Sequence, residues 1–478
     1  MTYLIAIDNG SQSTKVSLVD EHGRLHASAQ GRLRPYDTSV PGRVVHPGDD
    51  LWDSVRSTCR QAMARFAGDP AEIVGVGLCT IRFCRVLLAA DGTLTEPVLS
   101  WMDPRVSAPY QSSGAATRWV TTSSGYITRR LTGRFVDTAA NYQGVWPIDQ
   151  DTAAWSTDPA AYVATGMTRE SLVDLVQPGE RLGGVTALAA AETGIPAGLP
   201  VYATANDKAV EALGSGLRDD DTVLLSLGTY IAAMTTGSAA GDAAGAYWSN
   251  FASTPRRYLY ESGGIRRGMW TVSWYRTLLE GDLGPDGPLL PAGSSLEDQL
   301  NAGASKVAAG SNGLMTLLDW LAPGQAPYRR GALIGFDGSQ GRFHVYRSIL
   351  EGIALTMLDH TRTMERALGR RFTSVIVSGG GSRSDLMVQI VADVFGLPAR
   401  RTGVNDAAGL GAAICAAVGA GLHPDWDTAV EAMVTVADTF EPDPDQVAAY
   451  GEIHRIYAGL TAYTDPLFRF TSGEPALS

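Results

Sequence analysis

Cysteine is scarce in this chain of 478 residues. Its four cysteines are Cys59, Cys79, Cys84 and Cys415, and none belongs to a C-x-x-C pair. A metal site of that kind or a disulfide framework is therefore not expected, and the sequence favours buried thiols in a reducing compartment. The seven histidines show no metal-ligand spacing either.

Long hydrophobic runs are also absent from the sequence. No uninterrupted apolar run reaches the length of a membrane span, and no basic stretch precedes the short apolar run near the first residue. We therefore expect a cytoplasmic protein. The formal net charge of −12 argues against nucleic acid or an anionic membrane as the main partner. An anionic nucleotide stays compatible with this charge, because Mg²⁺ and backbone amides set the field of such a site.

Apolar runs of strand length alternate with segments of helical period along the whole chain. The longest helix is expected over residues 347–368, a helix of small residues over 407–417, and a loop rich in glycine and proline over 281–294. This alternation favours an α/β class. The length is too great for one core, so more than one domain is expected.

Two similar strand-turn-strand patterns occur, one near the start of each half of the chain. In the first, Asp8, Asn9, Gly10 and Ser11 follow an apolar run and precede a second β-prone run. In the second, Gly228 and Thr229 interrupt the β-prone stretch over residues 222–234. Amides and hydroxyls in such turns can hold a phosphate, and Asp8 could face a hydrated divalent cation. One such hairpin is an ordinary turn, whereas two suggest a duplicated domain with two phosphate loops.

Asp207 is the leading candidate for a general base. It follows a short buried strand over residues 201–204 and precedes Lys208 and a helix of small residues. Open α/β sheets bind ligands at this edge, and a carboxylate there can take a proton from a hydroxyl. The alternative is that Asp207 is a helix N-cap, which is a common role for aspartate.

Other candidates carry weaker patterns. The run Gly379-Gly380-Gly381 lies between a strand and a helix, where a base or ribose could approach the backbone, but it does not complete a dinucleotide fingerprint. Several side chains could form a sugar pocket or could equally be solvated or structural. They are Arg82 and Phe83 near a strand end, and Trp101, Asp103 and Arg105 in one short segment. Lys15 and Lys208 could contact phosphate or water.

Taken together, these segments resemble the FGGY carbohydrate kinases, which include xylulokinase, ribulokinase and glycerol kinase. The resemblance rests on motifs in a fixed order: residues 7–15 as the first phosphate motif, Trp101-Met102-Asp103-Pro104-Arg105, Leu131-Thr132-Gly133, residues 198–201 leading to Asp207, Ser226-Leu227-Gly228-Thr229, residues 350–354, residues 379–393 and Gly411-Ala412-Ala413. It covers nearly the whole chain.

The resemblance implies two actin-like domains with ribonuclease-H-like cores around a central cleft, at residues 1–220 and 221–478. It implies ATP-dependent phosphorylation of a sugar or polyol hydroxyl, with Asp207 as the base and with Asp8 and Asp207 at the Mg²⁺. The residues that would contact the nucleotide are Gly10, Ser11, Gln12, Ser13, Gly228, Thr229, Gly380, Gly381, Ser384 and Asp385. The residues that would contact the sugar are Arg82, Phe83, Trp101, Asp103, Arg105 and Asp207.

The chain departs from its relatives at the sugar side. Glycerol kinases carry an Arg-Glu pair and xylulokinases a Met-His pair near Arg82-Phe83, and neither pair is present. The segment after Arg105 is also shorter than is usual in the family. A ketopentose such as xylulose or ribulose is the leading substrate, with erythritol or another alditol as the alternative. A sugar- and ATP-binding regulator without turnover is the alternative from another class. For partners we expect a small sugar or polyol and no nucleic acid or membrane, with a homodimer as the assembly to test.

Overall fold

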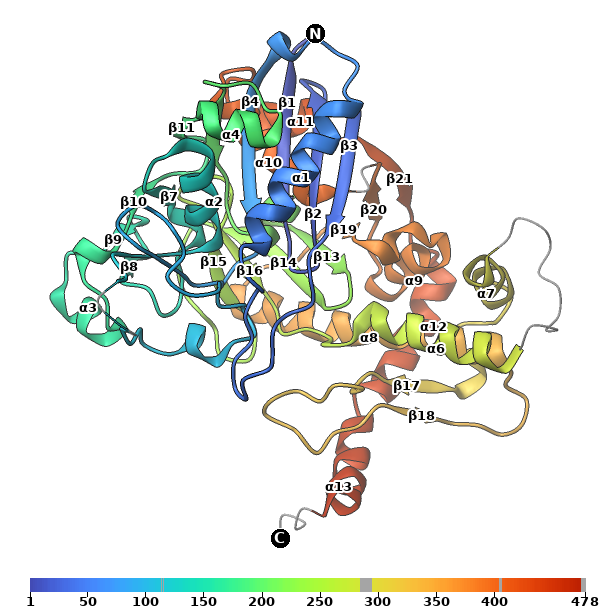
Figure 1. Ribbon diagram of the computed structural model, residues 1–478. Helices are drawn as coiled ribbons and strands as arrows, with labels where there is room; N and C mark the ends of the chain where they lie inside the picture. The colour runs from blue at the N-terminus through green and yellow to red at the C-terminus, as the bar shows by residue number, and fades with distance from the viewer. Residues whose placement is uncertain (113, 115, 284–294, 404–405, 474–478) are drawn as a thin grey trace.

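The computed structural model describes residues 1–112, 114, 116–283, 295–403 and 406–473, which build two large β-sheets flanked by helices (Figure 1). The first sheet has the strand order β11-β12-β4-β1-β2-β3. Its strands are β1 (Tyr3–Asn9), β2 (Ser13–Asp20), β3 (Leu25–Arg32), β4 (Ile73–Thr80), β11 (Arg181–Gly184) and β12 (Pro200–Ala203).

The second sheet has the strand order β15-β16-β14-β13-β19-β20-β21. Its strands are β13 (Thr222–Leu227), β14 (Ile231–Gly237), β15 (Trp248–Phe251), β16 (Tyr258–Glu261), β19 (Ser374–Ser378), β20 (Ala399–Thr402) and β21 (Val436–Phe440). Short two-stranded ladders lie outside both sheets: β5 (Val86–Leu88) with β6 (Trp119–Thr121), β7 (Val136–Thr138) with β10 (Asp174–Val176), β8 (Ile148–Asp149) with β9 (Ala154–Trp155), and β17 (Met315–Leu317) with β18 (Ala332–Ile334).

The two sheets repeat one topology. In the first, β1 pairs antiparallel with β2, β2 with β3, and β4 and β12 continue parallel to β1. In the second, β13 pairs antiparallel with β14, β14 with β16, and β19 and β20 continue parallel to β13. The duplication expected from the two hairpins is therefore present. We propose the domain boundary expected from the sequence, 1–220 and 221–478, because the strands of each large sheet come from one of these ranges.

Helices connect and cover the sheets, and the longest one lies where the sequence predicted it, starting five residues earlier. The helices are α1 (Asp50–Arg65), α2 (Ser123–Thr132), α3 (Pro159–Thr165), α4 (Ala187–Thr193), α5 (Asp207–Gly214), α6 (Gly268–Leu283), α7 (Leu296–Ala304), α8 (Arg342–Leu368), α9 (Asp385–Phe395), α10 (Ala407–Gly419), α11 (Trp426–Met433), α12 (Pro444–Tyr457) and α13 (Leu460–Ser472). The loop expected at 281–294 is replaced by helix up to Leu283, and its remainder lies outside the described residues. Among the described helices, none is both long and apolar enough to cross a membrane.

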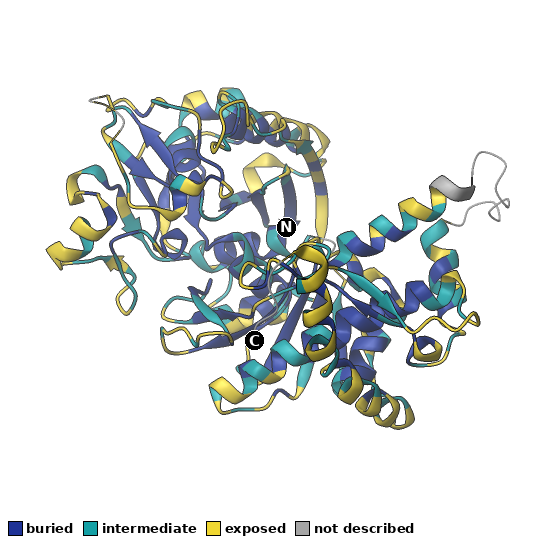
Figure 2. Ribbon diagram, turned by 90° about the horizontal axis from the view of Figure 1, so that it is seen from below, coloured by how far each residue is buried: buried dark blue, intermediate teal, exposed yellow. Residues whose placement is uncertain are grey.

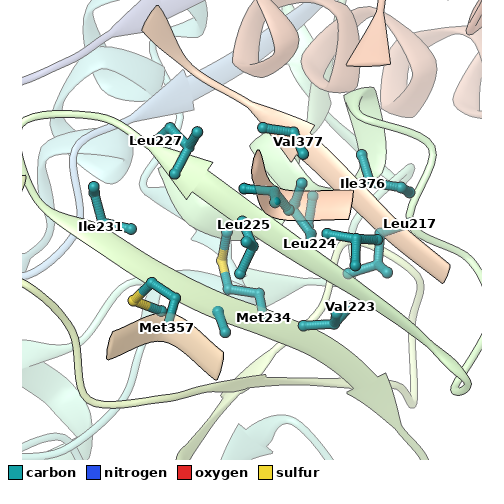
Figure 3. Packing of buried hydrophobic residues seen from close by; sticks show 14 of the residues in the cluster. Leu217, Val223, Leu224, Leu225, Leu227, Ile231, Met234, Met357, Ile376 and Val377 are labelled. Carbon is teal, nitrogen blue, oxygen red and sulfur yellow. The ribbon is translucent and has the colours of Figure 1, made fainter. Parts of the chain in front are cut away.

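The hairpin of β13 and β14 is anchored in the largest hydrophobic core. Leu227 and Ile231, on either side of its turn, are both fully buried. Figure 3 shows the side chains of these two strands packed with Val377 of β19 and Met357 of α8. Figure 2 shows how burial is distributed over the molecule: the strands inside are buried, and exposed residues lie on outer helices and loops. Rigid packing below the turn fixes where its backbone amides lie.

The helices that follow the last parallel strand of each half, α5 and α10, meet backbone to backbone. A Cβ added at Gly411 of α10 would lie 1.9 Å from the Val210 carbonyl oxygen of α5. A Cβ added at Gly214 of α5 would lie 1.9 Å from the Ala407 carbonyl oxygen. Helix α10 also packs on the first sheet, where a Cβ at Gly77 would lie 2.0 Å from the Ala412 oxygen. These glycines let the two halves dock closely, because no side chain separates the two backbones.

Replacing Gly411 with alanine is expected to lower the free energy of unfolding by about 1–3 kcal/mol, because backbone on both sides cannot yield to the added methyl group. Urea unfolding measures this effect. Gly451→Ala is the matched control, since a Cβ at Gly451 of α12 meets nothing within 4 Å. The control should be neutral or stabilising by up to about 1 kcal/mol. Equal stability of the two variants would contradict the proposed contact.

Candidate active site

Four parallel-strand ends converge where the two halves meet. Asp8 lies near the end of β1, Asp207 follows β12, Ser226 lies near the end of β13, and Ser378 ends β19. Hydrogen bonds join Ser226 and Ser378 to Glu211 of α5, which pairs with Lys208. Lys15 pairs with Asp406, directly before α10. Asp8 and Asp207 interact with these charged groups electrostatically. The site therefore draws on both sheets, as expected for a ligand held between two related domains.

Asp207 is the first residue of α5 but does not serve as its main cap. The Asn206 side-chain oxygen accepts from the backbone amides of Lys208 and Ala209, each at 3.1 Å. Asp207 Oδ1 accepts from the Lys208 amide at 3.0 Å and faces the Arg82 Nε at 3.7 Å. Burial raises the pKa of Asp207 against the lowering effect of Arg82 and Lys208. A carboxylate with a raised pKa is a stronger base, which suits proton abstraction from an alcohol.

Arg82 ties the two halves together beside Asp207. Its Nη1 and Nη2 donate to the two carboxylate oxygens of Glu261 in β16 at 2.8 and 3.0 Å, and Nη1 reaches Asn250 Oδ1 at 3.4 Å. Glu261 is 1% exposed, so this bidentate pair is desolvated. The guanidinium also lies over the Trp248 ring, at 4.8 Å from its centroid.

Phe83, next to Arg82, has a positive φ of 64°. This region is costly for a bulky residue, and such strain gathers at binding sites where the surroundings enforce it. The Phe83 ring lies 6.0 Å from the Trp248 ring, centroid to centroid. Arg85 differs from Arg82: it is 3% exposed and donates to the backbone oxygens of residues 105, 106 and 108. Arg85 thus supports a loop, whereas Arg82 and Phe83 face the junction of the halves.

Asp8 is buried among other acids. Burial is the first cause that raises its pKa to about 7, and the neighbouring carboxylates of Asp406, Asp207 and Glu211 raise it further, while Lys15 lowers it. The Lys15 ammonium contacts Asp406 Oδ1 at 3.3 Å. The cluster therefore carries more negative than positive side chains, which is a setting that a cation would stabilise.

Asp8→Asn is expected to stabilise the protein at pH 8 in the absence of divalent cations. The folded state holds the Asp8 proton up to about pH 7, whereas the unfolded chain loses it near pH 4. Ionising the buried carboxylate therefore costs stability as the pH rises from about 4 to 7. The gain in the variant should reach about 2–4 kcal/mol at pH 8 and vanish near pH 4. Urea unfolding in a chelator measures it, and a gain that is equal at both pH values would contradict the assignment.

Glu211 joins the two halves one helical turn after Asp207. Its Oε1 accepts from the Ser226 and Ser378 hydroxyls, each at 2.7 Å, and its Oε2 contacts the Lys208 ammonium at 2.7 Å. These donors, with Lys208 as the largest favourable influence, hold the Glu211 pKa below its usual value in spite of burial. Glu211 is therefore an ionised anchor between α5, β13 and β19.

A cavity of about 560 Å³ opens beside this network. It is lined by residues from the first hairpin, α5, the glycine run and the start of α10, among them Lys15, Glu211, Gly379, Gly380, Ser382 and Asp406. Gly379 has φ +80°, and a Cβ there would lie 2.7 Å from the Leu227 oxygen, so the glycine run packs directly on the second hairpin. Gly380 is exposed toward open space, whereas Gly381 is buried beneath it.

The two hairpin turns have different supports. In the first, the Gly10 amide bonds to the Ser13 oxygen, Tyr36 donates to the Ser11 oxygen, and Gln12 is exposed. In the second, the Gly228 and Thr229 carbonyl oxygens accept the backbone amides of Met269 and Gly268 at the start of α6. Both turns thus leave their tips at the surface of the junction while their flanks are fixed.

The helix after the glycine run presents two other predicted residues to a second cavity of about 1090 Å³. The Ser384 hydroxyl caps α9 through the Met387 amide and donates to Asn301 Oδ1 of α7 at 2.8 Å. Asp385 pairs with Arg401 at 2.6 Å. Arg383 lines both cavities, so they adjoin across the turn that carries Gly380 and Gly381.

The segment with Trp101, Asp103 and Arg105 forms a compact local unit. Asp103 is 1% exposed, accepts from the Val44 and Arg105 amides, and pairs with the Arg105 guanidinium at 2.8 Å. Trp101 is 46% exposed. Asp103 thus fixes the segment, and Trp101 and Arg105 are its outward groups.

Sequence reasoning missed Glu211, Asp406, Asn250 and Glu261. Glu211 could have been found, because it lies four residues after Asp207 and so on the same helix face. Asp406 could have been noticed as an acid directly before a helix. Neither Asn250 nor Glu261 has a local pattern that marks it, because both reach Arg82 from the second sheet, far away in the sequence.

Comparisons with known proteins agree with this architecture. Residues 3–118 match the N-terminal domain of the FGGY family of carbohydrate kinases, and residues 223–420 match its C-terminal domain. The Escherichia coli (strain K12) protein named "Uncharacterized sugar kinase YgcE" is 48% identical over 468 residues, which cover 98% of this chain and 95% of that protein. A Staphylococcus epidermidis protein named xylulose kinase is 29% identical over 302 residues, covering 61% of this chain and 57% of its own.

Solved structures show the same fold. The crystal structure of xylulose kinase from Rhodospirillum rubrum superposes with a TM-score of 0.82 and 24% identity, covering 98% of this chain and 100% of that one. The two repeated sheets therefore form the two-domain actin-like fold, as the resemblance implied. The chain belongs to the FGGY family of carbohydrate kinases.

Proposed function

We propose that this carbohydrate kinase transfers the γ-phosphoryl group of ATP to a hydroxyl of a small open-chain sugar, with a ketopentose such as xylulose or ribulose as the leading substrate. The observation that carries the proposal is the position of Asp207. It lies at the junction of the two halves, with Arg82 on one side and, through Lys208, the end of the second hairpin strand on the other.

In this proposal Asp207 takes the proton of the attacking hydroxyl, and its raised pKa increases its strength as a base. The turn residues Gly10, Ser11, Gln12, Ser13, Gly228 and Thr229 line the phosphates, and the bond of the Gly10 amide to the Ser13 oxygen fixes the first turn. Phosphoryl transfer needs positioning and charge neutralisation more than covalent chemistry, so these groups suffice. Close approach of the two halves around the substrates would exclude water and limit wasteful hydrolysis of ATP.

Mg²⁺ fits the acidic side of the site. When bound with ATP, it neutralises charge on the phosphates. Asp8, with Asp207 nearby, would hold it through water, because no group of three potential ligand side chains gathers closely enough among the described residues to bind a metal directly. Magnesium commonly keeps several waters and takes one or two carboxylates plus phosphates, which matches this donor set.

The nucleotide would extend across the glycine run. Its phosphates occupy the cavity lined by Lys15 and Gly380, and its adenosine passes Gly380 and Gly381 toward Ser384 and Asp385. The open space above Gly380 supports this path, since a side chain there would obstruct it.

The sugar would lie against Arg82, Phe83 and Trp248. Arg82 and its partners Glu261 and Asn250 offer both donors and acceptors, as a polyhydroxy compound requires. Trp101 and Arg105 stay candidates for the outer wall of the pocket, whereas Asp103, predicted to contact the sugar, is buried beneath them and holds their segment. The similarity to relatives named xylulose kinase supports testing a ketopentose first.

The test is an ADP-release assay with Mg-ATP over ketopentoses, alditols including erythritol, and aldoses. Turnover that depends on a ketopentose supports the proposal in full. Turnover on an alditol alone would show that the substrate is an alditol and not a ketopentose. Nucleotide binding without turnover on any candidate would favour a sugar- and ATP-binding regulator. Hydrolysis of ATP that does not depend on sugar would contradict phosphorylation of a sugar.

A further inference from the structure

Lysine is rare in this chain. The sequence has three lysines, Lys15, Lys208 and Lys306, among 38 lysine and arginine residues, so the other 35 are arginine. Two of the three lie in the network at the junction of the halves. Arginine is a planar fork that suits bidentate pairs, whereas lysine is a compact point charge on a flexible stem. A lysine at this place therefore calls for a chemical explanation.

Lys208 contacts both the candidate base and a strand of the second hairpin. Its own backbone amide donates to the candidate base Asp207. Its Nζ donates to Ser226 Oγ at 3.0 Å, and Ser226 lies two residues before the turn glycine Gly228. The charge is thus held next to the hairpin that would bind the phosphates, and it interacts electrostatically with the carboxylate of Asp207.

Contacts from both halves fix the direction of the ammonium. Glu211 Oε2 lies 2.7 Å from Nζ, and Glu211 is itself held by the Ser226 and Ser378 hydroxyls of the second sheet. A lysine ammonium has three hydrogens. Glu211 and Ser226 take two, and no further acceptor contacts the ammonium within the part of the chain that the structure describes.

The other cations of the junction pair with different carboxylates, and Lys15 also lines the cavity proposed for the phosphates. Glu261 binds Arg82 in a bidentate pair, and Lys15 contacts Asp406 at 3.3 Å. The side chain of Lys208 is 20% exposed, and its partner Glu211 lines the cavity proposed for the phosphates, so the ammonium lies next to that cavity. A phosphoryl group in transfer gains most from a cation fixed in advance in a site that excludes water.

We propose that the Lys208 ammonium contacts the transferring phosphoryl group of ATP, and that Glu211 acts as the positioning residue that aims it. The inference rests on the proposed function, because it names a further group in the same phosphoryl transfer. Since Ser226 and Ser378 belong to the second sheet and Lys208 to α5, the ammonium takes this position only while the two halves are docked.

Nucleotide binding tests the contact without any sugar. Calorimetry compares ADP with the non-hydrolysable β,γ-imido analogue of ATP, both with Mg²⁺, for the wild type and for Lys208→Gln. We expect the variant to lose about 10-fold or more in affinity for the analogue while its affinity for ADP changes less than about twofold, because the lost hydrogen bond is to a charged group. An equal loss for both nucleotides would overturn the proposal.

Kinetics on the substrate found in the screen give a second readout. For Lys208→Gln, kcat should fall about 10- to 100-fold with little change in the sugar KM. Lys208→Arg should recover part of kcat, and Glu211→Gln should lower kcat less than Lys208→Gln does. A raised sugar KM at unchanged kcat would overturn the proposal, since it would make Lys208 a sugar ligand. Arg56→Gln, an exposed change on α1, is the control for the loss of one positive charge.

Amine labelling adds a readout that does not depend on substitution. With three lysines in the chain, reductive methylation followed by mass spectrometry reports each amine separately. The ATP analogue should protect Lys208 more than ADP does. Lys306 lines the second cavity, where the adenosine common to both nucleotides would lie, so its protection should be equal for the two and reports occupancy. Equal protection of Lys208 by both nucleotides would contradict the contact. Failure of the sugar screen would refute the proposed function and leave this comparison interpretable.

Discussion

Asp207→Asn should lower kcat by about 10²- to 10⁴-fold, the range for removing a general base. Asparagine keeps the shape of the side chain and the hydrogen bond from the Lys208 amide, but it cannot accept a proton at neutral pH. The fold should persist, because Asn206 supplies the cap of α5. Steady-state kinetics with Mg-ATP and the best sugar of the screen measure the effect.

Two controls separate chemistry from binding in this variant. ADP affinity should stay within about threefold of wild type, since the proposed phosphate contacts come from other residues. Asp53→Asn on α1 removes an exposed carboxylate outside the site and should leave kcat unchanged. If Asp207→Asn kept wild-type kcat, Asp207 would not be the base, and the transfer would have to proceed without it.

Arg82→Met should destabilise the protein by about 3–5 kcal/mol, the usual cost of leaving one member of a buried ion pair alone. Glu261 would lose both of its charged hydrogen bonds while staying almost fully buried. The double variant Arg82→Met/Glu261→Met removes both charges, and it should regain most of the lost stability, because a buried pair often adds little over apolar replacements. Urea unfolding of the wild type, Arg82→Met and the double variant measures these differences in stability.

The same variants test the proposed role of Arg82 at the sugar site. The double variant, although stable, should show a raised sugar KM, because it lacks the donors and acceptors that Arg82 and Glu261 offer. Recovery of both stability and wild-type KM would show that the pair is structural. Failure of the double variant to recover stability would show that Asn250 and Trp248 depend on the guanidinium as well.

The Arg82 pair also explains a departure from the family's pattern. The sequence has no glutamate beside Arg82, where glycerol kinases carry one. In the structure an acidic partner comes instead from Glu261, 179 residues away, on the second sheet. A pair that spans the two halves couples the proposed sugar side of the site to their docking, which a neighbouring glutamate on the same loop would not do.

The local parts of the fold were predictable because their information lies in short stretches. The turns at Gly10 and Gly228 are marked by glycine between β-prone runs, and the helix at residues 342–368 by its apolar period. The loop predicted at 281–294 was wrong in its first three residues, because α6 continues through Gly281 to Leu283. The amino-acid composition thus predicted that the helix would end before residue 281, three residues too early.

The candidate site was predictable only in part. Asp8 and Asp207 follow strands, so position along the chain was enough to single them out, and the alternative role of Asp207 as a cap was settled by Asn206. Ser384 and Asp385 were predicted beside the glycine run, yet their side chains face the second cavity and bond to Asn301 and Arg401. Which face a side chain takes after a tight turn depends on packing that the sequence does not display.

By itself the sequence determined the α/β class, the duplicated hairpins, the family resemblance and a short set of acidic and glycine residues, because each is encoded within a few consecutive residues. Only the tertiary structure decided which charges meet. Lys15 contacts Asp406, 391 residues later, and Arg82 contacts Glu261. Glu211 accepts hydrogen bonds from hydroxyls on two strands of the other half. The physical reason is that an ion pair depends on distance and desolvation, and both are set by how α5 and α10 dock through their glycines.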